Sequence, residues 1–298
     1  MKYAYYPGCS LRGTGRAYEE SLLAVFRSLE IEAQELDDWN CCGATTYLSV
    51  DELTSYALAA RNLALAERER MDIIAPCAAC YLVLNKTQRY IRDYPDIKTV
   101  VSRALTAIGL EYRDRVRVRH PLDVFLNDIG VKAIAAKVVK PLKGLKVAPY
   151  YGCQIVRPYA TFDDQRNPTT MDRLLEACGA TVIPYTLKTR CCGGSQKGTL
   201  PEVGLDLIRY LITEAQKNGA DVIATVCPLC QFNLECFQKE ASGQLRDAQF
   251  RRDPLSIPVL YFTQLMALAL GAPGVTIGME RSLVPIEPVL AAKEIAYA

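Results

Sequence analysis

The sequence predicts an α/β fold made of two duplicated domains, each a small parallel sheet flanked by helices, with extra helices between the halves. Two observations support this prediction. In both halves, short runs of β-branched and aromatic residues alternate with longer helical patterns. In addition, one pattern of five cysteines occurs twice, with the two copies roughly 150 residues apart. That spacing is too long for a solenoid repeat and fits two domains of ordinary size.

The first half contains three predicted strands, each followed by a helical pattern. The predicted strands are KYAYY (2–6), IEAQEL (31–36) and DIIAP (72–76). The predicted helices cover roughly 12–29 and 51–70, and a third begins near Ala79. Strands that alternate with helices in this way imply a parallel sheet with right-handed crossovers.

The second half repeats this order of elements. Its predicted strands are LKVAPYY (145–151), TVIPY (181–185) and DVIATV (221–226). Its predicted helices cover roughly 169–178 and 201–218, and a third begins near Leu229. We therefore expect the same parallel sheet in both halves.

Two segments lie outside this repeat. The segment 93–143 has helical patterning, and we expect extra helices and a linker that ends near Pro141 and Gly144. This divides the chain into a first domain with a helical extension, 1–140, and a second domain, 141–298. The stretch after Gly271 is rich in proline and glycine, and we expect it to form a surface tail packed on the body.

The composition favours a cytoplasmic protein with two hydrophobic cores. Half of the 298 residues are apolar, which is enough for two cores without disulfide support. We expect no secretory signal in MKYAYYPGCS, and no membrane span in the window 259–275, which Thr263, Gln264 and Pro273 interrupt. The formal net charge is only +2 and there is no long basic run, so nothing indicates binding to nucleic acid.

Ten of the twelve cysteines belong to the repeated pattern. Each copy contains a lone cysteine, an adjacent pair followed by glycine, and a CxxC motif. The first copy consists of Cys9, Cys41, Cys42, Cys77 and Cys80, and the second of Cys153, Cys191, Cys192, Cys227 and Cys230. Both copies leave 34 residues between the pair and the CxxC motif, and they leave 31 and 37 residues between the lone cysteine and the pair.

The predicted strands bring the five cysteines of each copy together. The lone cysteine follows the first strand, the pair follows the second, and the CxxC motif follows the third, where a helix begins. The carboxyl ends of parallel strands share one edge of the sheet, where ligands usually bind. Gly43 and Gly193 suit tight turns that direct two neighbouring thiols to the same centre.

Clustered thiols in a reducing compartment indicate a metal or redox centre. Thiolate is a soft ligand that selects zinc, copper(I) or iron–sulfur clusters. A structural zinc ion takes four ligands and would leave one cysteine unused, and a cubane four-iron cluster usually shows a compact run of CxxC spacings. Five ligands, two of them adjacent, favour an unusual iron–sulfur cluster, with zinc binding and thiol–disulfide exchange as alternatives.

The chain resembles the B-type subunits of heterodisulfide reductases, which contain two CCG domains. The resemblance spans nearly the whole length, in the segments YYPGCS, NCCG, CAAC, YYGCQIVRP, NPTTMDRLLEACGA, RCCGGS and CPLCQFNLE. It implies that each set of five cysteines holds one noncubane 4Fe-4S cluster. It also implies that the two clusters flank a disulfide and cleave it reductively, which takes two electrons and two protons.

The resemblance also implies partner subunits. The sequence has no flavin fingerprint and no ferredoxin-type CxxCxxCxxxCP run, so we expect electrons to arrive from other proteins. A C-type subunit with ferredoxin-like 4Fe-4S clusters and an A-type flavoprotein subunit would supply them. The chain would then be the catalytic subunit of a heterodisulfide-reductase-like complex, acting on a small thiol or disulfide substrate or on protein-bound sulfur.

Two other functions remain open. The chain could be an electron-relay CCG subunit of another oxidoreductase complex. It could also catalyse the reverse reaction at the same site, acting on thiols or protein-bound sulfur in a sulfur-oxidation pathway.

Five residues outside the cysteine pattern have separate interpretations. Arg157 and Arg166 lie in a segment inserted after the lone cysteine of the second copy, where either could pair with an acidic group of a thiol substrate; a solvated loop explains them as well. His120 is expected to have a surface or capping role rather than to donate protons. Cys178 and Cys236 are expected to be small buried residues.

Overall fold

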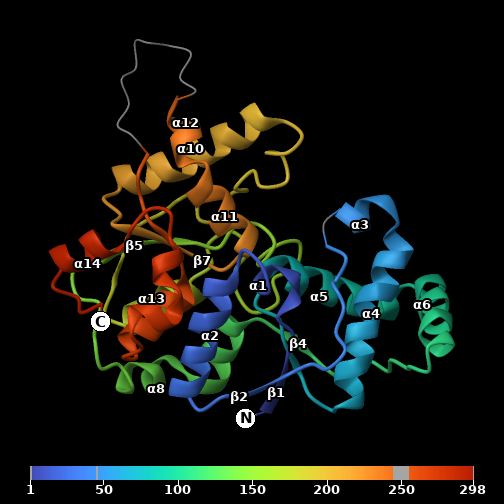
Figure 1. Ribbon diagram of the computed structural model, residues 1–298. Coiled ribbons are helices and arrows are strands. Elements are labelled where there is room, and N and C mark those ends of the chain that lie inside the picture. The colour runs from blue at the N-terminus through green and yellow to red at the C-terminus, as the bar shows by residue number, and fades with distance from the viewer. Residues whose placement is uncertain (1, 45, 244–254, 298) are drawn as a thin grey trace.

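Two parallel sheets of four strands each organise the chain, one in each half (Figure 1). The computed structural model describes residues 2–44, 46–243 and 255–297. The strand orders are β2-β1-β3-β4 and β6-β5-β7-β8, so the second sheet repeats the topology of the first. Helices flank both sheets, as expected for an α/β fold.

The first sheet and its helices come from the N-terminal half. The strands are β1 (Lys2–Tyr5), β2 (Glu32–Glu35), β3 (Ile73–Ile74) and β4 (Val118–Arg119). The helices are α1 (Gly8–Leu11), α2 (Arg16–Ser28), α3 (Thr46–Val50), α4 (Glu52–Arg68), α5 (Ala78–Asp93), α6 (Pro95–Ala107), α7 (Pro121–Asp123), the π-helix η1 (Val124–Ile129) and α8 (Val131–Ala136). Local chemistry explains the helix starts: for example, the Asp51 carboxylate accepts the N–H of Thr54 at 3.0 Å and caps α4.

The second sheet and its helices come from the C-terminal half. The strands are β5 (Lys146–Tyr150), β6 (Thr181–Val182), β7 (Val222–Thr225) and β8 (Val259–Tyr261). The helices are α9 (Thr170–Ala177), α10 (Pro201–Lys217), α11 (Pro228–Cys236), α12 (Gln238–Gly243), α13 (Phe262–Ala269), the 3-10 helices η2 (Gly274–Ile277) and η3 (Met279–Arg281), and α14 (Glu287–Ala292). Both α10 and α11 begin with proline, which lacks the N–H that a first helical position leaves unbonded.

The structure confirms the fold class and contains every strand and helix of the predicted repeat. One helix differs at its start: α2 begins at Arg16 rather than near residue 12, since residues 8–11 form the separate helix α1. The prediction missed the fourth strand of each sheet. The segment 93–143 therefore contains the strand β4 as well as the expected extra helices.

The C-terminal segment is more than a surface tail. Ile277, Met279, Ile286 and Leu290 are all buried. The helix η2 packs against α2 of the first half, and so does α13, which lies beside α2 in Figure 1. One continuous hydrophobic core thus includes residues of both halves. The segment contributes to that core because its apolar residues, separated by prolines and glycines, turn back onto the body.

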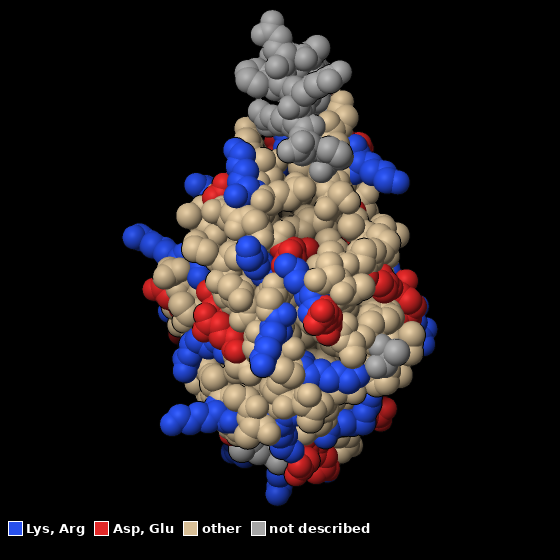
Figure 2. All heavy atoms as spheres, turned by 90° about the vertical axis from the view of Figure 1, so that its left-hand side faces the viewer, with Lys and Arg blue, Asp and Glu red and all other residues tan. Residues whose placement is uncertain are grey.

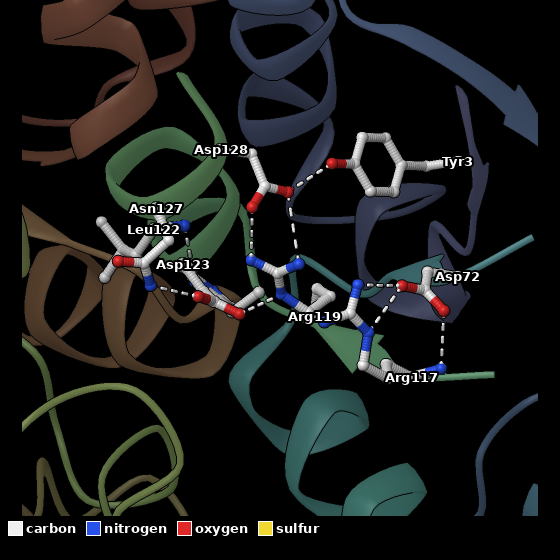
Figure 3. Close-up of polar contacts among 9 residues, drawn as sticks. Tyr3, Asp72, Arg117, Arg119, Leu122, Asp123, Asn127 and Asp128 are labelled. Carbon is white, nitrogen blue, oxygen red and sulfur yellow. Dashed lines mark hydrogen bonds and ion pairs between the residues drawn. The ribbon is translucent and has the colours of Figure 1, made fainter. Parts of the chain in front are cut away.

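A buried ion network connects β4 to β1 and η1 (Figure 3). The Arg119 guanidinium, at the end of β4, donates to both carboxylate oxygens of Asp128 at 3.1 and 3.2 Å and to Asp123. The Tyr3 hydroxyl of β1 donates to Asp128 as well. The network therefore fixes the position of a strand that is only two residues long.

The surface drawn in Figure 2 carries charged side chains of both signs. On the face drawn in Figure 2, the described Lys and Arg side chains are interspersed with Asp and Glu side chains rather than gathered into one basic patch. None of the helices in the described ranges has the length and apolar content needed to cross a membrane.

Candidate functional site

The five cysteines of the first copy converge at the carboxyl edge of the first sheet. Cys9 lies in α1, directly after β1, and Cys41 and Cys42 lie in the loop after β2. Cys77 and Cys80 lie at the start of α5, which follows β3. The Sγ atoms of Cys9 and Cys41 are 3.8 Å apart, and those of Cys42 and Cys80 are 3.3 Å apart.

The five cysteines of the second copy converge in the same way. Hydrogen bonds link the thiol of Cys153 to that of Cys191, and the thiol of Cys230 to those of Cys192 and Cys227. The backbone also contributes donors to the adjacent pair. The N–H of Gly193 donates to the Cys191 sulfur at 3.4 Å, and the N–H of Gly194 donates to the Cys192 sulfur at 3.3 Å. Both amides of this glycine pair are thus directed at thiol sulfur.

The glycine after each cysteine pair has a left-handed backbone, with φ of 79° at Gly43 and 81° at Gly193. Only glycine adopts this conformation without steric strain. At Gly193 a Cβ atom would also lie 2.9 Å from the Cα of Gly204 in α10. The predicted tight turn is thus confirmed, and helix packing adds a second reason for glycine.

We expect Gly193→Ala to destabilise the protein by about 2–4 kcal/mol, because left-handed strain adds to a backbone clash that cannot be relieved cheaply. Gly219→Ala is the matched control, since Gly219 has φ of 74° but no atom within 4 Å of the place that a Cβ would occupy. It should cost about 1 kcal/mol from strain alone. Urea unfolding curves of the two variants measure the difference, and equal losses would show that packing against α10 contributes nothing.

Two tyrosines outside the cysteine pattern hold the cysteine pairs in place. The Tyr6 hydroxyl donates to the carbonyl of Asn40 at 2.8 Å, and the Tyr150 hydroxyl donates to the carbonyl of Arg190 at 2.7 Å. Each acceptor immediately precedes a cysteine pair. The prediction from sequence missed this role, although the repeated YY before each lone cysteine is a signal that could have indicated it.

The lone-cysteine loop of each half contacts the CxxC helix of the other half. In one direction, a Cβ atom on Gly15, in the loop after α1, would lie 3.2 Å from Pro228 of the second CxxC motif. In the other direction, the ring of Phe162, in the loop after the second lone cysteine, meets the ring of Tyr81 at 6.1 Å. Each lone-cysteine loop therefore lies on the CxxC helix of the other half, and α1 and α11 are neighbours in Figure 1.

Contacts between thiols make their acidities unequal. A hydrogen bond from Cys41 lowers the pKa of the Cys42 thiol, and the same bond raises the pKa of Cys41. In the second set, a hydrogen bond from Cys153 lowers the pKa of Cys191, and the pKa of Cys153 rises in turn. The thiols of each set are therefore close enough for the ionisation of one to depend on that of its neighbours.

The donor chemistry fits a thiolate-bound cluster better than a single ion. Each set offers five soft sulfur donors, and buried polar atoms without hydrogen-bond partners in the described ranges lie nearby. Ser55 Oγ would lie 2.9 Å from a Cβ on Gly43, and Thr225 lies two residues before Cys227.

A surface groove of about 800 Å³ reaches one of the two sets. It is lined by Cys191 itself, by apolar side chains that include Leu207 and Leu211, and by Arg190 and Lys217. The groove therefore gives a small molecule access from solvent to Cys191 of the second cysteine pair.

His120 has the predicted capping role, although it is fully buried rather than on the surface. Its Nδ1 accepts the N–H of Leu122 at 3.2 Å as the N-cap of α7, and its Nε2 donates to the carbonyl of Pro76 at 2.9 Å. Burial lowers the pKa of the imidazole to about 3. The ring therefore stays neutral with both nitrogens bonded, which leaves no proton to donate.

The remaining residues with separate interpretations have varied surroundings. Arg157 is exposed and donates to the carbonyl of Thr189. The hydrogen bond from Cys153 is the largest cause of the lowered pKa of Cys191, and the charge of Arg157 makes a smaller contribution in the same direction. Arg166 is exposed, and its backbone N–H donates to Asp164. Cys178 is fully buried, as predicted, and burial raises its pKa to about 12. Cys236 is only half-buried.

Comparison with known proteins gives the chain relatives in one family. The model of the cysteine-rich CCG domain matches residues 3–85 and 147–235. The B-type subunit of the ferredoxin:CoB-CoM heterodisulfide reductase of Methanosarcina mazei is 30% identical over 95% of this chain and 94% of its own length. A protein of Archaeoglobus profundus that is described as similar to the same heterodisulfide reductase subunit is 32% identical over 91% of both chains.

Two further similarities widen this comparison. The membrane anchor subunit of the 8-methylmenaquinol:fumarate reductase of Wolinella succinogenes is 30% identical over 95% of this chain and 97% of its own length. The crystal structure of a hypothetical protein from Helicobacter pylori superposes with a TM-score of 0.74 at 14% identity, covering 95% of this chain and 52% of that one. At that identity the structural match shows the fold alone.

Proposed function

The chain belongs to the cysteine-rich CCG domain family, with two copies of the domain, and on that premise we propose that it is the iron–sulfur subunit of a heterodisulfide-reductase-like complex that cleaves a disulfide reductively. The similarity of nearly the whole chain to B-type heterodisulfide reductase subunits supports an oxidoreductase subunit of this kind. The observation that carries the proposal is that two complete five-thiol sets lie on elements that meet at the junction of the halves, where each lone-cysteine loop contacts the CxxC helix of the other half.

In this proposal each set of thiols holds one noncubane 4Fe-4S cluster. The ligands of the first cluster would be Cys9, Cys41, Cys42, Cys77 and Cys80, and those of the second would be Cys153, Cys191, Cys192, Cys227 and Cys230. When bound, such clusters supply single electrons and iron sites with affinity for sulfur.

The protein itself stabilises charge on sulfur and excludes water. The N–H groups of Gly193 and Gly194 donate to cysteine sulfur, which stabilises negative charge at the second set. Buried rings at the junction, among them Tyr18 and Tyr261, exclude water from the space beside both CxxC motifs. Excluding water strengthens every electrostatic interaction there and protects reduced sulfur from side reactions.

Two complete sets suit disulfide chemistry for a physical reason. Cleavage of a disulfide consumes two electrons and two protons and releases two sulfur atoms. A site on each side of the bond can receive one sulfur and deliver one electron. A chain that only relays electrons needs no such pair of complete sets.

The proposal includes partners, a compartment and a domain division. We expect a C-type subunit with ferredoxin-like 4Fe-4S clusters and an A-type flavoprotein to supply electrons. We expect the complex to be cytoplasmic, and the domains to divide near residue 140. Arg157, which lies near Cys191, is a candidate to bind an acidic group of the substrate, and Arg166 is a weaker candidate because it is exposed and no cysteine is among its contacts.

An electron-relay subunit is the second candidate. The observation that favours it is the similarity to the anchor subunit of a fumarate reductase, whose name includes a quinol and fumarate but no disulfide. The same ligands would then hold clusters that pass electrons to or from a quinol.

A disulfide assay separates the two functions. The complex, purified without oxygen, is given a reduced one-electron dye and either a panel of disulfides or a quinone analogue. The proposed function predicts dye oxidation that depends on the disulfide, with two thiols released for every two electrons consumed. Dye oxidation by the quinone analogue alone, without thiol release, would support the relay and reject disulfide cleavage.

A further inference from the structure

An exposed apolar surface follows the first cysteine pair. Tyr47 and Val50 of α3 and Leu53 at the start of α4 are 47%, 78% and 45% exposed, and these three side chains form what we call the apolar surface. The helix α3 packs against α4 and lies at its upper end in Figure 1. Large apolar side chains that gather on a surface with a polar rim mark a site of contact with another molecule.

Contacts along α4 place the apolar surface beside the first cysteine pair. A Cβ atom on Gly43, the residue after the pair, would lie 2.9 Å from the Oγ of Ser55 in the first turn of α4. Before the pair, the Asn40 side chain donates to the carbonyl of Leu58, further along α4, at 3.0 Å. The segment that contains the pair therefore runs along α4 toward its start, where Leu53 lies two residues before Ser55.

The first set also contains the two exposed cysteines of the chain. Cys9 and Cys41 are exposed, with Sγ atoms 3.8 Å apart, whereas the other ten cysteines are half-buried or buried. Their equivalents in the second set, Cys153 and Cys191, are half-buried. The first set is therefore the more accessible of the two to a large partner.

Four exposed carboxylates surround the apolar surface, two before the cysteine pair and two where α3 meets α4. They are Asp37, Asp38, Asp51 and Glu52. Arg61 pairs with Asp38, and Lys86 pairs with Glu52 at 3.0 Å. Within the described ranges no ion pair engages Asp37 or Asp51, so this rim keeps a negative charge.

The second half repeats the exposed apolar positions. Val50 and Leu200 each lie eight residues after the second cysteine of a pair. Leu53 and Val203 each lie eleven residues after it, and all four side chains are exposed. The two halves therefore offer a comparison in which apolar content is similar.

The acidic rim, by contrast, is not repeated. The positions equivalent to the four carboxylates, 150 residues later, are Leu187, Lys188, Pro201 and Glu202. Arg190 directly precedes the second pair and lines the groove beside it. The surroundings of the first pair therefore suit a basic partner, and those of the second pair do not.

The charge of the rim distinguishes between possible partners. A second copy of the chain that made contact through the same surface would bring carboxylates against carboxylates. An anionic lipid surface would repel the rim in the same way. A protein with lysine and arginine side chains around an apolar contact is complementary to it.

We propose that the apolar surface and its acidic rim form the docking site of the electron-donating partner subunit, which contributes an apolar contact surrounded by basic side chains. The inference rests on the proposed function and adds that electrons enter at the first cysteine set. In the overall step the S–S bond breaks, the partner delivers two electrons through this contact, and each sulfur gains one proton from solvent. The groove at Cys191 stays open to a small substrate while the partner is bound.

Dissociation of the intact complex tests this site. Val50→Lys places a cation opposite the basic partner and should raise the dissociation constant about tenfold or more, since like charges at an interface are strongly unfavourable. Leu200→Lys is the matched control, because Leu200 is 58% exposed at the equivalent position of the second half. It should leave the dissociation constant unchanged. Mass photometry of the diluted complex measures both variants, and equal losses, or no loss in Val50→Lys, would overturn the proposal.

Asp37→Lys tests the rim without changing the apolar contact. It should slow association with the partner more than it speeds dissociation, and it should weaken the dependence of association on ionic strength. Biolayer interferometry with the immobilised full chain measures both rates. Association of the wild-type chain that does not slow as salt is raised would contradict a basic partner.

Hydrogen exchange locates the contact in the complex. The backbone amides of residues 46–53 should be more protected in the complex than in the chain alone, and those of residues 200–203 should not be. Protection of 46–53 by phosphatidylglycerol vesicles, or in a dimer of the chain that Val50→Lys disrupts, would assign the surface to a membrane or to a second copy and overturn the proposal.

A small electron donor separates docking from chemistry. With a reduced one-electron dye, which needs no docking site, Val50→Lys should release thiols from the disulfide at the wild-type rate. A lower rate with the dye would show that the substitution damages the site itself and would overturn the docking role. A wild-type complex that releases no thiol from any disulfide rejects the proposed function, while the dissociation and exchange measurements still decide where the partner binds.

Discussion

Replacing Cys227 by alanine is expected to remove about half of the bound iron, from about eight to about four atoms per chain, and to abolish disulfide cleavage. Cys227 is buried, is hydrogen-bonded to Cys230, and lies at the start of α11 where this helix meets the other half. Without Cys227 the second set has four thiols instead of five. Because the proposed cleavage uses both sets, loss of one cluster should eliminate activity rather than halve it.

Cys178→Ala provides the matched control for this prediction. Cys178 is as buried as Cys227 but lies at the end of α9, outside both sets. Iron content and activity should both remain, with only the loss of stability expected from a small cavity. Full iron content in Cys227→Ala would show that this cysteine is not a ligand, whereas equal iron loss in both variants would point to general unfolding.

Replacing Arg119 by methionine is expected to cost about 3–5 kcal/mol of folding free energy, the range for removing one partner of a buried ion pair. The guanidinium is only 10% exposed and pairs with two carboxylates, those of Asp123 and Asp128 (Figure 3). Methionine fills similar space but leaves both negative charges without their cation. Chemical denaturation at pH 7 measures the loss.

The pH dependence of this loss identifies its origin. Burial opposes ionisation of Asp128, but hydrogen bonds from Tyr3 and Arg119 outweigh it and lower the pKa of the carboxyl. A lowered pKa stabilises the fold above the ordinary Asp value of about 4, and the contribution disappears as the pH falls through the folded value. The difference between wild type and Arg119→Met should therefore shrink at pH 3.

Arg117→Met is the control for Arg119. Arg117 occupies the residue before β4 and pairs with Asp72, but its side chain is 74% exposed. Exposed ion pairs contribute little because water and salt screen them. A loss in Arg117→Met as large as that in Arg119→Met would contradict the assignment of the effect to the buried network.

Much of the site could be predicted because its residues are tied to regular elements. Cys77 and Cys227 follow apolar strands and begin helices, so alternating patterns alone bring them to the sheet edge. A glycine directly follows each cysteine pair, at Gly43 and Gly193, and this position predicts the tight turns that the structure contains. These features depend on local chemistry, which a single sequence contains.

The features that escaped prediction depend on contacts between distant segments. The strands β4 and β8 are defined by their pairing with β3 and β7, which lie well before them in the sequence. The burial of Ile277 and Leu290 depends on packing against the first half. The stacking of Tyr18 on Tyr261 joins residues from opposite ends of the chain, and no local pattern indicates it.

The most direct test of the central claim is the iron and acid-labile sulfide content of the anaerobically purified protein, followed by EPR after candidate thiols are added to the oxidised form. Two noncubane clusters predict about eight irons, an equal amount of sulfide and a paramagnetic signal that appears with the thiol. Zinc without sulfide would contradict the claim and leave two structural metal sites in its place.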